Sequence, residues 1–472
     1  MKRFLIGGVA VAALLGAAAW GAWQWGAGRL SDAIDAEAAR LAEQGVVLGW
    51  SARRIEGFPL NYAVVLERPH LRDANGEWAF EAARSRTVAA LPWPSTARTT
   101  VSSQATLTAA VAPGEVRRIE VISRDLSVET ALDGRRPATF AAEALALRPV
   151  GADGGTDAQF ELGFEGLSLT VATEPGGEAR FDLAADSLTS VAETSDGSGG
   201  VMRPVTRTTD VRVEGRARGW QAGDAAAFLT EGEAFLSLRA GRTVSTEGLV
   251  NGEAGPGRLE ARLQDGRLRY EADAEWARYE IAQGPGGPGG VIAVGAAEAL
   301  FEAPLRAGPG QPFAMRISVP TLEADEALWS LIDPQTTLAR GPLSLEADIT
   351  GAVALLVNAG DPLPGGEAPL RIETVDIRAL RLAGMGAAAD VSGALTLRPG
   401  APAPDGSLTV RLEGWEPLLQ ALVRLGVVGL DQAGLFALVA QQYNRQGAPA
   451  GVFDADVVLR DGVATVNGQP LR

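Results

Sequence analysis

The strongest hydrophobic pattern of the chain lies in its first 26 residues. Lys2 and Arg3 precede an apolar, uncharged run from Phe4 to Trp23. A helix rises about 1.5 Å per residue, so about 20 apolar residues span the roughly 30 Å hydrocarbon core of a bilayer. The pattern predicts a membrane anchor over residues 1–28. Its apolar and interfacial side chains are expected to be Phe4, Leu5, Ile6, Leu14, Leu15, Trp20 and Trp23.

The residues at the two ends of this run predict its orientation. Lys2 and Arg3 favour a cytoplasmic N-terminus, and Trp25 suits the far membrane interface. We therefore expect the chain after about Arg29 to lie outside the cytoplasm. An alternative interpretation places a signal-peptide cleavage site at the small residues 17–19, which would release a soluble protein. Apolar character continues past that site, which favours the uncleaved anchor.

Helical spacing of apolar residues continues after the anchor, over residues 29–45. Apolar residues recur about one turn apart at Leu30, Ile34, Ala38 and Leu41. With Gly45 as a stop, they predict a short amphipathic juxtamembrane helix. From Val46 the period changes to two, which is the period of β-strands. We divide this remainder into a first β-rich region, residues 46–290, and a second, residues 291–472.

The clearest predicted hairpin spans residues 259–274. Its two-residue loop, Asp265 and Gly266, suits a type I′ turn, which joins antiparallel strands. Leu259, Ala261 and Leu263 are expected to face Leu268, Tyr270 and Ala272. Similar alternation occurs near residues 160–171, 343–347, 395–412 and 453–465. Polar residues fill the intervening positions, so each strand should present one apolar and one solvated face.

Three helical segments interrupt the strands, near residues 223–231, 325–333 and 416–446. Gly426 and Gly429 are expected to divide the last segment into two helices. The predicted fold class is therefore mainly β, a β-rich α+β arrangement. We expect an N-terminal transmembrane helix followed by an elongated, curved antiparallel sheet with a few packed helices. A strand followed by a helix recurs loosely, twice with a Gly–Trp junction, at Trp220 and Trp415, which hints at duplicated units.

Composition excludes several classes of function. The sequence has no cysteine, which excludes disulfides, thiolate nucleophiles, cysteine metal sites and a lipid-modified cysteine. Its formal charge of −16 would repel nucleic acid, so no nucleic-acid partner is expected. The 472 residues are 46% hydrophobic, which is enough for a large core.

No residue pattern in the sequence points to catalysis. His70 is the single histidine, and a histidine without an evident carboxylate or serine partner is more often structural than catalytic. The glycine and proline string at residues 284–290 lacks the setting of a phosphate-binding loop, and its prolines remove amide donors. Asp454 and Asp456 alternate with apolar residues, as on a solvated strand face. We therefore expect no enzyme activity, catalytic residue, metal or cofactor.

Two short motifs carry a family resemblance, the stretch from Arg54 into the following strand and the segment Leu328–Pro334. Together with the N-terminal anchor and the C-terminal helices, they resemble a bacterial family catalogued as domain of unknown function 2125, found mainly in alphaproteobacteria. The architecture is more distantly similar to AsmA-like inner-membrane proteins, which are described as holding lipid chains in a long β-groove. The resemblance implies structural roles for the family-like motif Gly57, Phe58, Pro59, Trp329, Asp333 and Pro334.

These expectations combine into one functional hypothesis. We expect a single-pass inner-membrane protein, non-catalytic, whose periplasmic body binds or transfers lipid in an apolar β-groove of the cell envelope. Its expected partners are the inner membrane and either phospholipid or another envelope protein. The alternative is an envelope scaffold whose own helices fill the concavity. What separates the two hypotheses is the position, inside the groove or beside it, of Leu419, Leu422, Leu435 and Leu438.

Overall fold

The computed structural model describes most of the chain. The described residues are 2–90, 95–112, 115–132, 137–150, 160–174, 177–195, 201–219, 225–246, 250–281, 289–361, 369–400, 403–424 and 426–471. For residues 2–17 the description covers the backbone alone. Contacts divide the chain into two units. We call Met1–Glu174 with Arg180–Val211 the N-terminal unit, and Pro175–Ala179 with Arg212–Arg472 the C-terminal unit.

The chain begins with one continuous helix, α1 (Lys2–Glu43), so the predicted anchor and the predicted juxtamembrane helix form a single element. Gly45 follows its end with a φ of +81°, in the left-handed region that favours glycine. Among the residues that the structure describes, no helix is long and apolar enough to cross a membrane. Outside the described side chains lie those of Phe4, Leu5, Ile6, Leu14 and Leu15.

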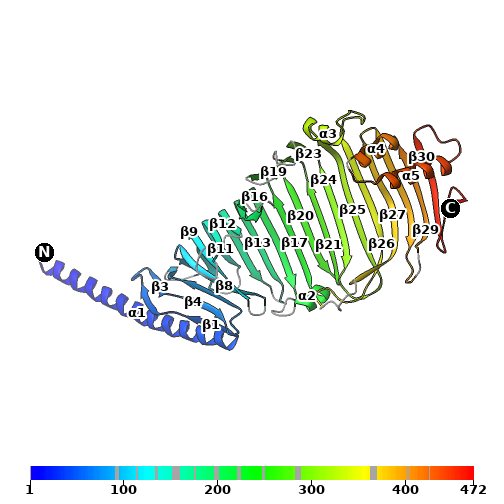
Figure 1. The fold of residues 1–472 in the computed structure, drawn as a ribbon. Coiled ribbons are helices and arrows are strands. Elements are labelled where there is room, and N and C mark those ends of the chain that lie inside the picture. The colour runs from blue at the N-terminus through cyan, green and yellow to red at the C-terminus, as the bar shows by residue number, and fades with distance from the viewer. Residues whose placement is uncertain are drawn as a thin grey trace. The chain divides into compact units, whose positions relative to one another are not determined.

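Two ladders of antiparallel strands build the N-terminal unit (Figure 1). The first runs in the order β2 (Ala52–Glu56), β3 (Asn61–Glu67), β6 (Arg84–Ala90), β7 (Thr96–Val101) and β10 (Ser127–Ala131). The second runs in the order β1 (Val46–Gly49), β4 (His70–Asp73), β5 (Trp78–Ala82), β8 (Gln104–Ala112) and β9 (Glu115–Arg124). Both ladders end on one long strand, β11 (Ala138–Val150), which pairs with β10 along its first half and with β9 along its second.

The N-terminal unit continues beyond β11 and contains a small apolar core. Strand β12 (Phe160–Thr173) pairs with β11, and β13 (Ala179–Ala192) lies beside β12, where the Ser187 hydroxyl donates to Glu165 Oε2 at 2.8 Å. A short pair, β14 (Thr194–Ser195) with β15 (Val201–Met202), follows. The core cluster has three buried members, Ala82, Ala105 and Val121, which come from β5, β8 and β9.

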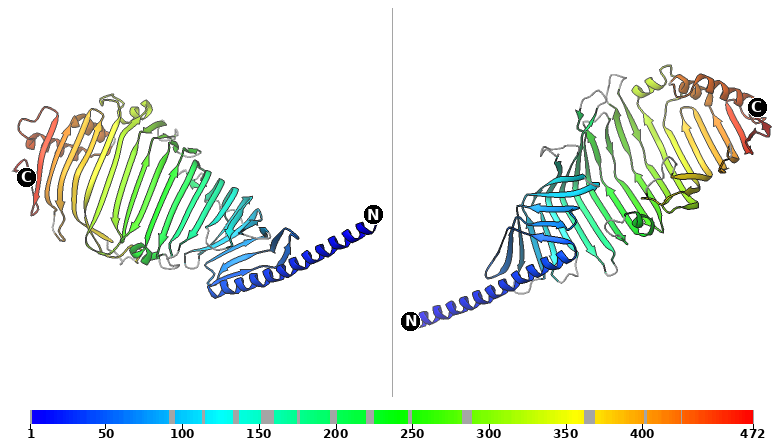
Figure 2. Two further views of the ribbon diagram at one scale, coloured as in Figure 1. Left: turned by 180° about the vertical axis from the view of Figure 1, so that it is seen from behind. Right: turned by 60° about the horizontal axis from the view of Figure 1, so that its bottom comes forward.

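The C-terminal unit has the same two-ladder arrangement and then extends it (Figures 1 and 2). The first ladder contains β16 (Val205–Arg218), β17 (Glu233–Ala240), β20 (Gly257–Gln264), β21 (Arg267–Ala274) and β24 (Ala297–Pro304). The second contains β18 (Thr243–Thr246), β19 (Val250–Ala254), β22 (Ala277–Ile281) and β23 (Gly290–Val294). Both ladders end on the long strand β25 (Gly308–Ala324).

Beyond β25 the sheet continues as an antiparallel series in chain order. Its strands are β26 (Leu343–Leu355), β27 (Leu370–Gly384), β28 (Ala387–Thr396), β29 (Asp405–Glu413), β30 (Val452–Arg460), β31 (Val463–Val466) and β32 (Gln469–Pro470). The connections between strands contain α2 (Ala225–Glu231), α3 (Glu326–Ile332), α4 (Trp415–Arg424) and α5 (Leu430–Tyr443). The prediction of a mainly β, antiparallel fold with a few helices is confirmed.

Local sequence signals explain several of these elements. The predicted hairpin is confirmed with its register, in which Leu263 pairs with Leu268, and both loop residues, Asp265 and Gly266, have positive φ values. The predicted division of the C-terminal helical segment is also confirmed, since Gly426 has a φ of +71° and Gly429 is the N-cap of α5.

Candidate functional site

The pairing register aligns apolar residues into continuous rows across the sheet of the C-terminal unit. Residues directly opposite each other in neighbouring strands point to the same face. One such row, from β16 to β30, is Val213, Leu238, Leu259, Ala272, Ala299, Ile317, Ala347, Leu380, Val391, Val410 and Ala455. A second row across the same strands is Gly215, Leu236, Ala261, Tyr270, Phe301, Met315, Ile349, Ile377, Gly393, Leu408 and Val457. We call the surface that these rows form the apolar face.

A third, shorter row extends the apolar face on its C-terminal side. From β25 to β30 it consists of Val319, Leu345, Leu382, Ala389, Leu412 and Phe453. The three rows together contain no charged residue. The apolar face is therefore continuous over the whole first ladder and over the strands that follow it.

The opposite side of the same strands is charged. On the other face, the row next to the first apolar row, on the side of the third, is Arg212, Arg239, Arg258, Asp273, Glu298, Ser318, Glu346, Arg381, Asp390, Arg411 and Asp454. Neighbours of opposite sign pair across strands, as where Arg381 lies 2.8 Å from Asp390 and 3.0 Å from Glu346. Hydrogen bonds to these two carboxylates raise the pKa of Arg381. The sheet is thus amphipathic, with one face suited to water.

Irregular pairing keeps the apolar face continuous where simple alternation would break it. In β27 the register shifts between Ile377 and Leu380, so these two residues, three positions apart, both lie on the apolar face. Without the shift, one of them would point to the charged face. A search of the sequence for strict alternation of apolar and polar residues does not find this register shift.

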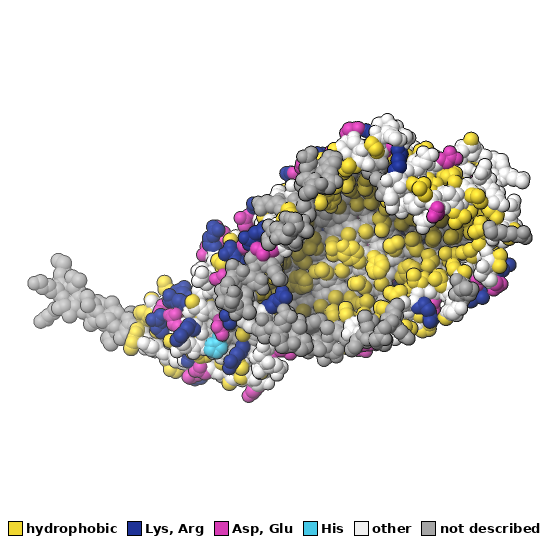
Figure 3. All heavy atoms as spheres, viewed as in Figure 1, with side chains coloured by type: hydrophobic (Ala, Val, Ile, Leu, Met, Phe, Trp, Pro, Cys, Tyr) yellow, Lys and Arg dark blue, Asp and Glu magenta, His cyan; other side chains and the backbone are white. Residues whose placement is uncertain are grey.

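Much of the apolar face is open to solvent. Exposed fractions are 44% for Phe301, 36% for Leu345 and 39% for Leu382, which are large values for side chains of this size. Figure 3 shows apolar side chains gathered in a hollow on this side of the C-terminal unit. The seven neighbouring strands β17, β20, β21, β24, β25, β26 and β27 are spaced about 4.8 Å apart, so this part of the sheet measures about 29 Å across the strands.

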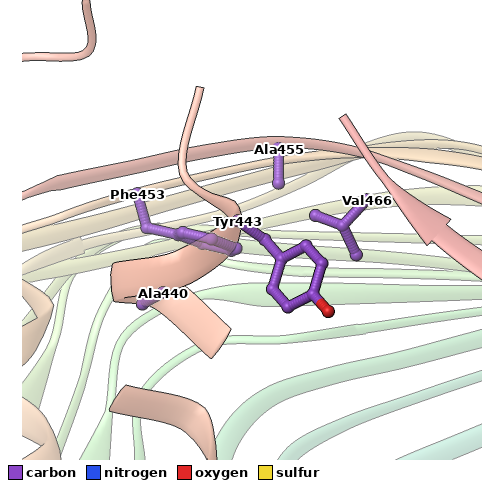
Figure 4. Packing of buried hydrophobic residues seen from close by; sticks show 5 residues of the cluster. All are labelled: Ala440, Tyr443, Phe453, Ala455 and Val466. Carbon is purple, nitrogen blue, oxygen red and sulfur yellow. The ribbon is translucent and has the colours of Figure 1, made fainter. Parts of the chain in front are cut away.

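Helices α4 and α5 cover the C-terminal end of the apolar face, and we call them the cap. Ala440 and Tyr443 of α5 are buried against Phe453 and Ala455 of β30 and Val466 of β31 (Figure 4). Aromatic rings extend this contact. Phe436 of α5 lies edge-on between two rings, 5.1 Å from Trp415 and 5.8 Å from Phe453.

A buried carboxylate joins the cap to α3. Asp333 follows α3 and is completely buried. Its carboxylate accepts hydrogen bonds from the Thr337 hydroxyl and the Leu338 backbone N–H, both at 2.7 Å, and lies 3.6 Å from Arg424 of α4. Burial acts to raise the pKa of Asp333, but these hydrogen bonds and the Arg424 charge outweigh it and hold the pKa below its usual value. Beside this network Trp329 is buried with Leu338 and Ala421.

A cavity of about 200 Å³ lies between the cap and the sheet, and we call it the cap cavity. Its sheet walls include Leu343, Leu382, Met385, Ala389 and Leu412, and its helix walls are Trp415, Leu418, Leu419, Leu422 and Phe436. Leu382 belongs both to this wall and to the open part of the apolar face. The cap cavity therefore continues from the apolar face.

The four leucines that separate the two functional hypotheses fall into two pairs. Leu419 and Leu422 of α4 face the sheet and line the cap cavity. Leu435 and Leu438 of α5 point away from it, with exposed fractions of 66% and 57%. The cap therefore fills one end of the apolar face and leaves the large side chains of β24 to β27 exposed.

The predicted motif near residue 57 forms a turn that contacts α1. Gly57 has a φ of +102°, and a Cβ there would lie 1.9 Å from Asn61 Oδ1, so glycine is required. The Phe58–Pro59 peptide bond is cis. The Phe58 ring lies edge-on to Trp23 of α1, with centroids 6.0 Å apart.

Further contacts hold α1 on the ladder of β2 and β3. The Trp23 indole stacks on Tyr62 at 5.6 Å, and its Nε1–H donates to the Asn61 carbonyl at 3.1 Å. Arg53 forms two hydrogen bonds of 2.8 Å to Asp35 and one of 2.6 Å to Ser31. Trp20, which was also predicted to belong to the membrane anchor, is 53% exposed.

None of the residues considered for chemistry belongs to the rows of the apolar face. His70 is half-buried on β4, and its ring packs over Gly49 of the neighbouring strand. Arg445 binds Asp454 at 2.9 Å and Asp456 at 2.7 Å. Within the described ranges no three acidic or histidine side chains gather as metal ligands would. Trp220 and most of residues 284–290 lie outside the described residues.

Fold and surface together define an antiparallel β-sheet protein with one charged and one apolar face. Comparison with known protein families then identifies the family to which the chain belongs. The model of the family described as "Uncharacterized protein conserved in bacteria (DUF2125)" matches residues 23–294 and again residues 212–472, so the chain belongs to this family. No curated protein and no solved structure matches the chain. The likeness to AsmA-like proteins stays a prediction.

Proposed function

We propose that this protein is a non-catalytic lipid-binding protein of the bacterial cell envelope, whose apolar face holds acyl chains. The observation that carries the proposal is the set of unbroken apolar rows from β16 to β30, with large side chains such as Phe301 and Leu345 left exposed. Exposed apolar surface costs roughly 25 cal/mol per Å², so a sheet that keeps such a surface needs a hydrocarbon or protein to cover it.

The chemistry of the face favours hydrocarbon over protein. A protein interface forms about one hydrogen bond per 100–200 Å². The interior strands of the sheet pair on both sides, so their backbone groups are already engaged, and the rows offer no charged side chain. Acyl chains need no hydrogen bonds and follow a surface of varied relief, which suits this face.

The position of the cap supports the lipid proposal over the scaffold alternative. A self-filled scaffold would direct the leucines of α5 into the hollow, whereas Leu435 and Leu438 point to solvent. The cap packs on β28 to β31, and the face between β17 and β27 stays available. A scaffold with a self-filled core would not explain why this apolar surface is exposed.

Anchorage at the inner membrane is part of the proposal. The run from Phe4 to Ala22 is uncharged and follows Lys2 and Arg3, and the next residue, Trp23, contacts Tyr62 and Asn61 of β3. A reporter fused after Arg472 should be active only when exported, and the protein in the membrane fraction should retain its N-terminal residues. A soluble chain beginning near Trp20 would contradict the anchor.

Photocrosslinking tests lipid binding on the full chain. We would incubate the protein with phosphatidylcholine that carries a diazirine on one acyl chain, irradiate it and map the labelled peptides. Labels are expected on β20 to β27. The matched pair of variants is Phe301→Asp, on the apolar face, and Leu300→Asp, the adjacent residue on the charged face. The first should lose most of the label, because an acid among acyl chains is poorly solvated, and the second should keep it.

The outcome separates the two hypotheses. Lack of label on the wild-type protein, or equal loss in both variants, would contradict lipid binding on the apolar face. Thermal melts of both variants show whether either change unfolds the sheet.

A further inference from the structure

The cap cavity has the properties of a closed end to the apolar face. It lies where α4 and α5 cross the third apolar row, between Leu382, Ala389 and Leu412 of that row and Trp415 above them. Leu382 forms part of its wall and is still 39% exposed toward the open face. A chain that lies on the face can thus pass beneath the cap without crossing a polar barrier.

The size and lining of the cap cavity indicate what it can hold. Its volume of about 200 Å³ exceeds the roughly 150 Å³ of an engineered apolar cavity that stays dry and binds benzene. Leucine, alanine, methionine and aromatic side chains form its walls, and Glu413 is the one charged residue among them. The Glu413 side chain is exposed, and its row belongs to the charged face. Such a cavity suits a few methylene groups and a terminal methyl.

A polar headgroup is a poor occupant for the same space. Lipid phosphates bind to arginine, lysine or backbone N–H groups, and none of the described residues that line the cavity carries a basic side chain. The strand backbone at Ala389 and Leu412 is already paired within the sheet. The lining therefore selects the apolar end of a lipid over its polar end.

We propose that the cap cavity receives the terminal methyl end of a single acyl chain, so that a bound lipid lies with its tail under Trp415 and its headgroup away from the cap. This inference rests on the proposed function and adds to it a direction for the ligand. The cap then acts as an end stop, and Trp415 and Phe436 form its wall.

Fluorescence quenching by brominated lipid tests the direction. Full-length protein is mixed with phosphatidylcholine that carries bromines either near the terminal methyl or near the carbonyl of one chain. The contribution of Trp415 is obtained by subtracting the quenching measured in Trp415→Phe. We expect that the terminal label quenches Trp415 strongly and that the carbonyl label barely quenches it. Equal quenching by both labels, or none from Trp415, would overturn the proposal.

A cavity-filling variant gives a second readout. Ala389→Phe places a phenyl ring in the cavity, which is large enough to take it, and should remove most of the Trp415 quenching by the terminal label. Ala394→Phe, an exposed position on the other face of the same strand, is the matched control and should quench like the wild type. Unchanged quenching in Ala389→Phe would also overturn the proposal.

Failure of this proposal and failure of the proposed function give different results. If diazirine lipid labels β20 to β27 while Trp415 is not quenched, lipid binding stands and the end stop is wrong. If neither label nor quenching occurs, lipid binding itself is wrong.

Discussion

Asn467 forms hydrogen bonds with the backbone of Asp456 in the way that a residue of the next strand of the sheet would. The Asp456 backbone N–H donates to Asn467 Oδ1 at 2.8 Å, and the Asn467 N–H donates to the Asp456 carbonyl at 2.8 Å. Asn444 makes the equivalent contact with Asp454, whose N–H donates to Asn444 Oδ1 at 2.9 Å. β31 pairs with the last four residues of β30, so these two asparagines close the rest of its edge. An open edge would invite pairing with another chain.

Replacing Asn467 should therefore destabilise the last strands and promote self-association. The side chain takes part in three hydrogen bonds, to Asp454, Asp456 and Tyr443, so Asn467→Ala should lower the free energy of unfolding by about 2 kcal/mol. Thermal melting and sedimentation velocity measure the two effects. Asn467→Gly is the control for backbone strain, because the residue has a φ of +49°. If the glycine variant behaves like the wild type, strain and not edge closure explains the effect.

Truncation of the two neighbours Phe436 and Leu435 should change the stability of the protein by very different amounts. Phe436 packs between Trp415 and Phe453, so Phe436→Ala should cost about 3 kcal/mol and release α5 from the sheet. Leu435 is 66% exposed, so Leu435→Ala should change stability by less than about 0.5 kcal/mol. Hydrogen exchange of the α5 amides measures the release. Equal protection of α5 in both variants would contradict the assigned packing.

The sequence predicted the parts of the fold that local chemistry decides. Asp265 and Gly266 specify a two-residue turn, so the hairpin register followed, and the glycines at 426 and 429 marked the break between α4 and α5. Alternation in strands such as β29 showed that one face is apolar. These signals act within a few residues, which is why a single sequence contains them.

Non-local features could not be predicted in this way. Helix α5 has apolar residues all around it, so periodicity did not show that Phe436 faces the sheet and Leu435 faces solvent. The register shift beside Leu380 interrupts alternation without any glycine or proline at that point. The family resemblance implied a structural role for Asp333, but its buried contact with Arg424, 91 positions later, depends on tertiary packing and could not be predicted.

Acid should weaken the attachment of the cap through Asp333. Its pKa is lower in the folded protein than in the unfolded chain, where it is about 3.9, so its stabilising effect is complete above that value and is lost as pH falls through the folded pKa. Melting temperatures of wild type and Asp333→Asn, measured from pH 6 down to about pH 3, should differ most at high pH and converge on acidification. A difference that stays constant with pH would show that the carboxylate charge has no role.

Two tryptophans of α1 provide a matched test of how the helix is held. Trp23 stacks on Tyr62 and donates to the Asn61 carbonyl, so Trp23→Ala should weaken the docking of α1 on β3 by about 2 kcal/mol. Trp25 is 68% exposed, and Trp25→Ala should leave the docking unchanged. Limited trypsin digestion at the exposed Arg29, read by intact mass, reports the docking, because a released helix opens and is cleaved faster. Equal cleavage rates in the two variants would mean that the contacts of Arg53 with Asp35 and Ser31 suffice to hold the helix.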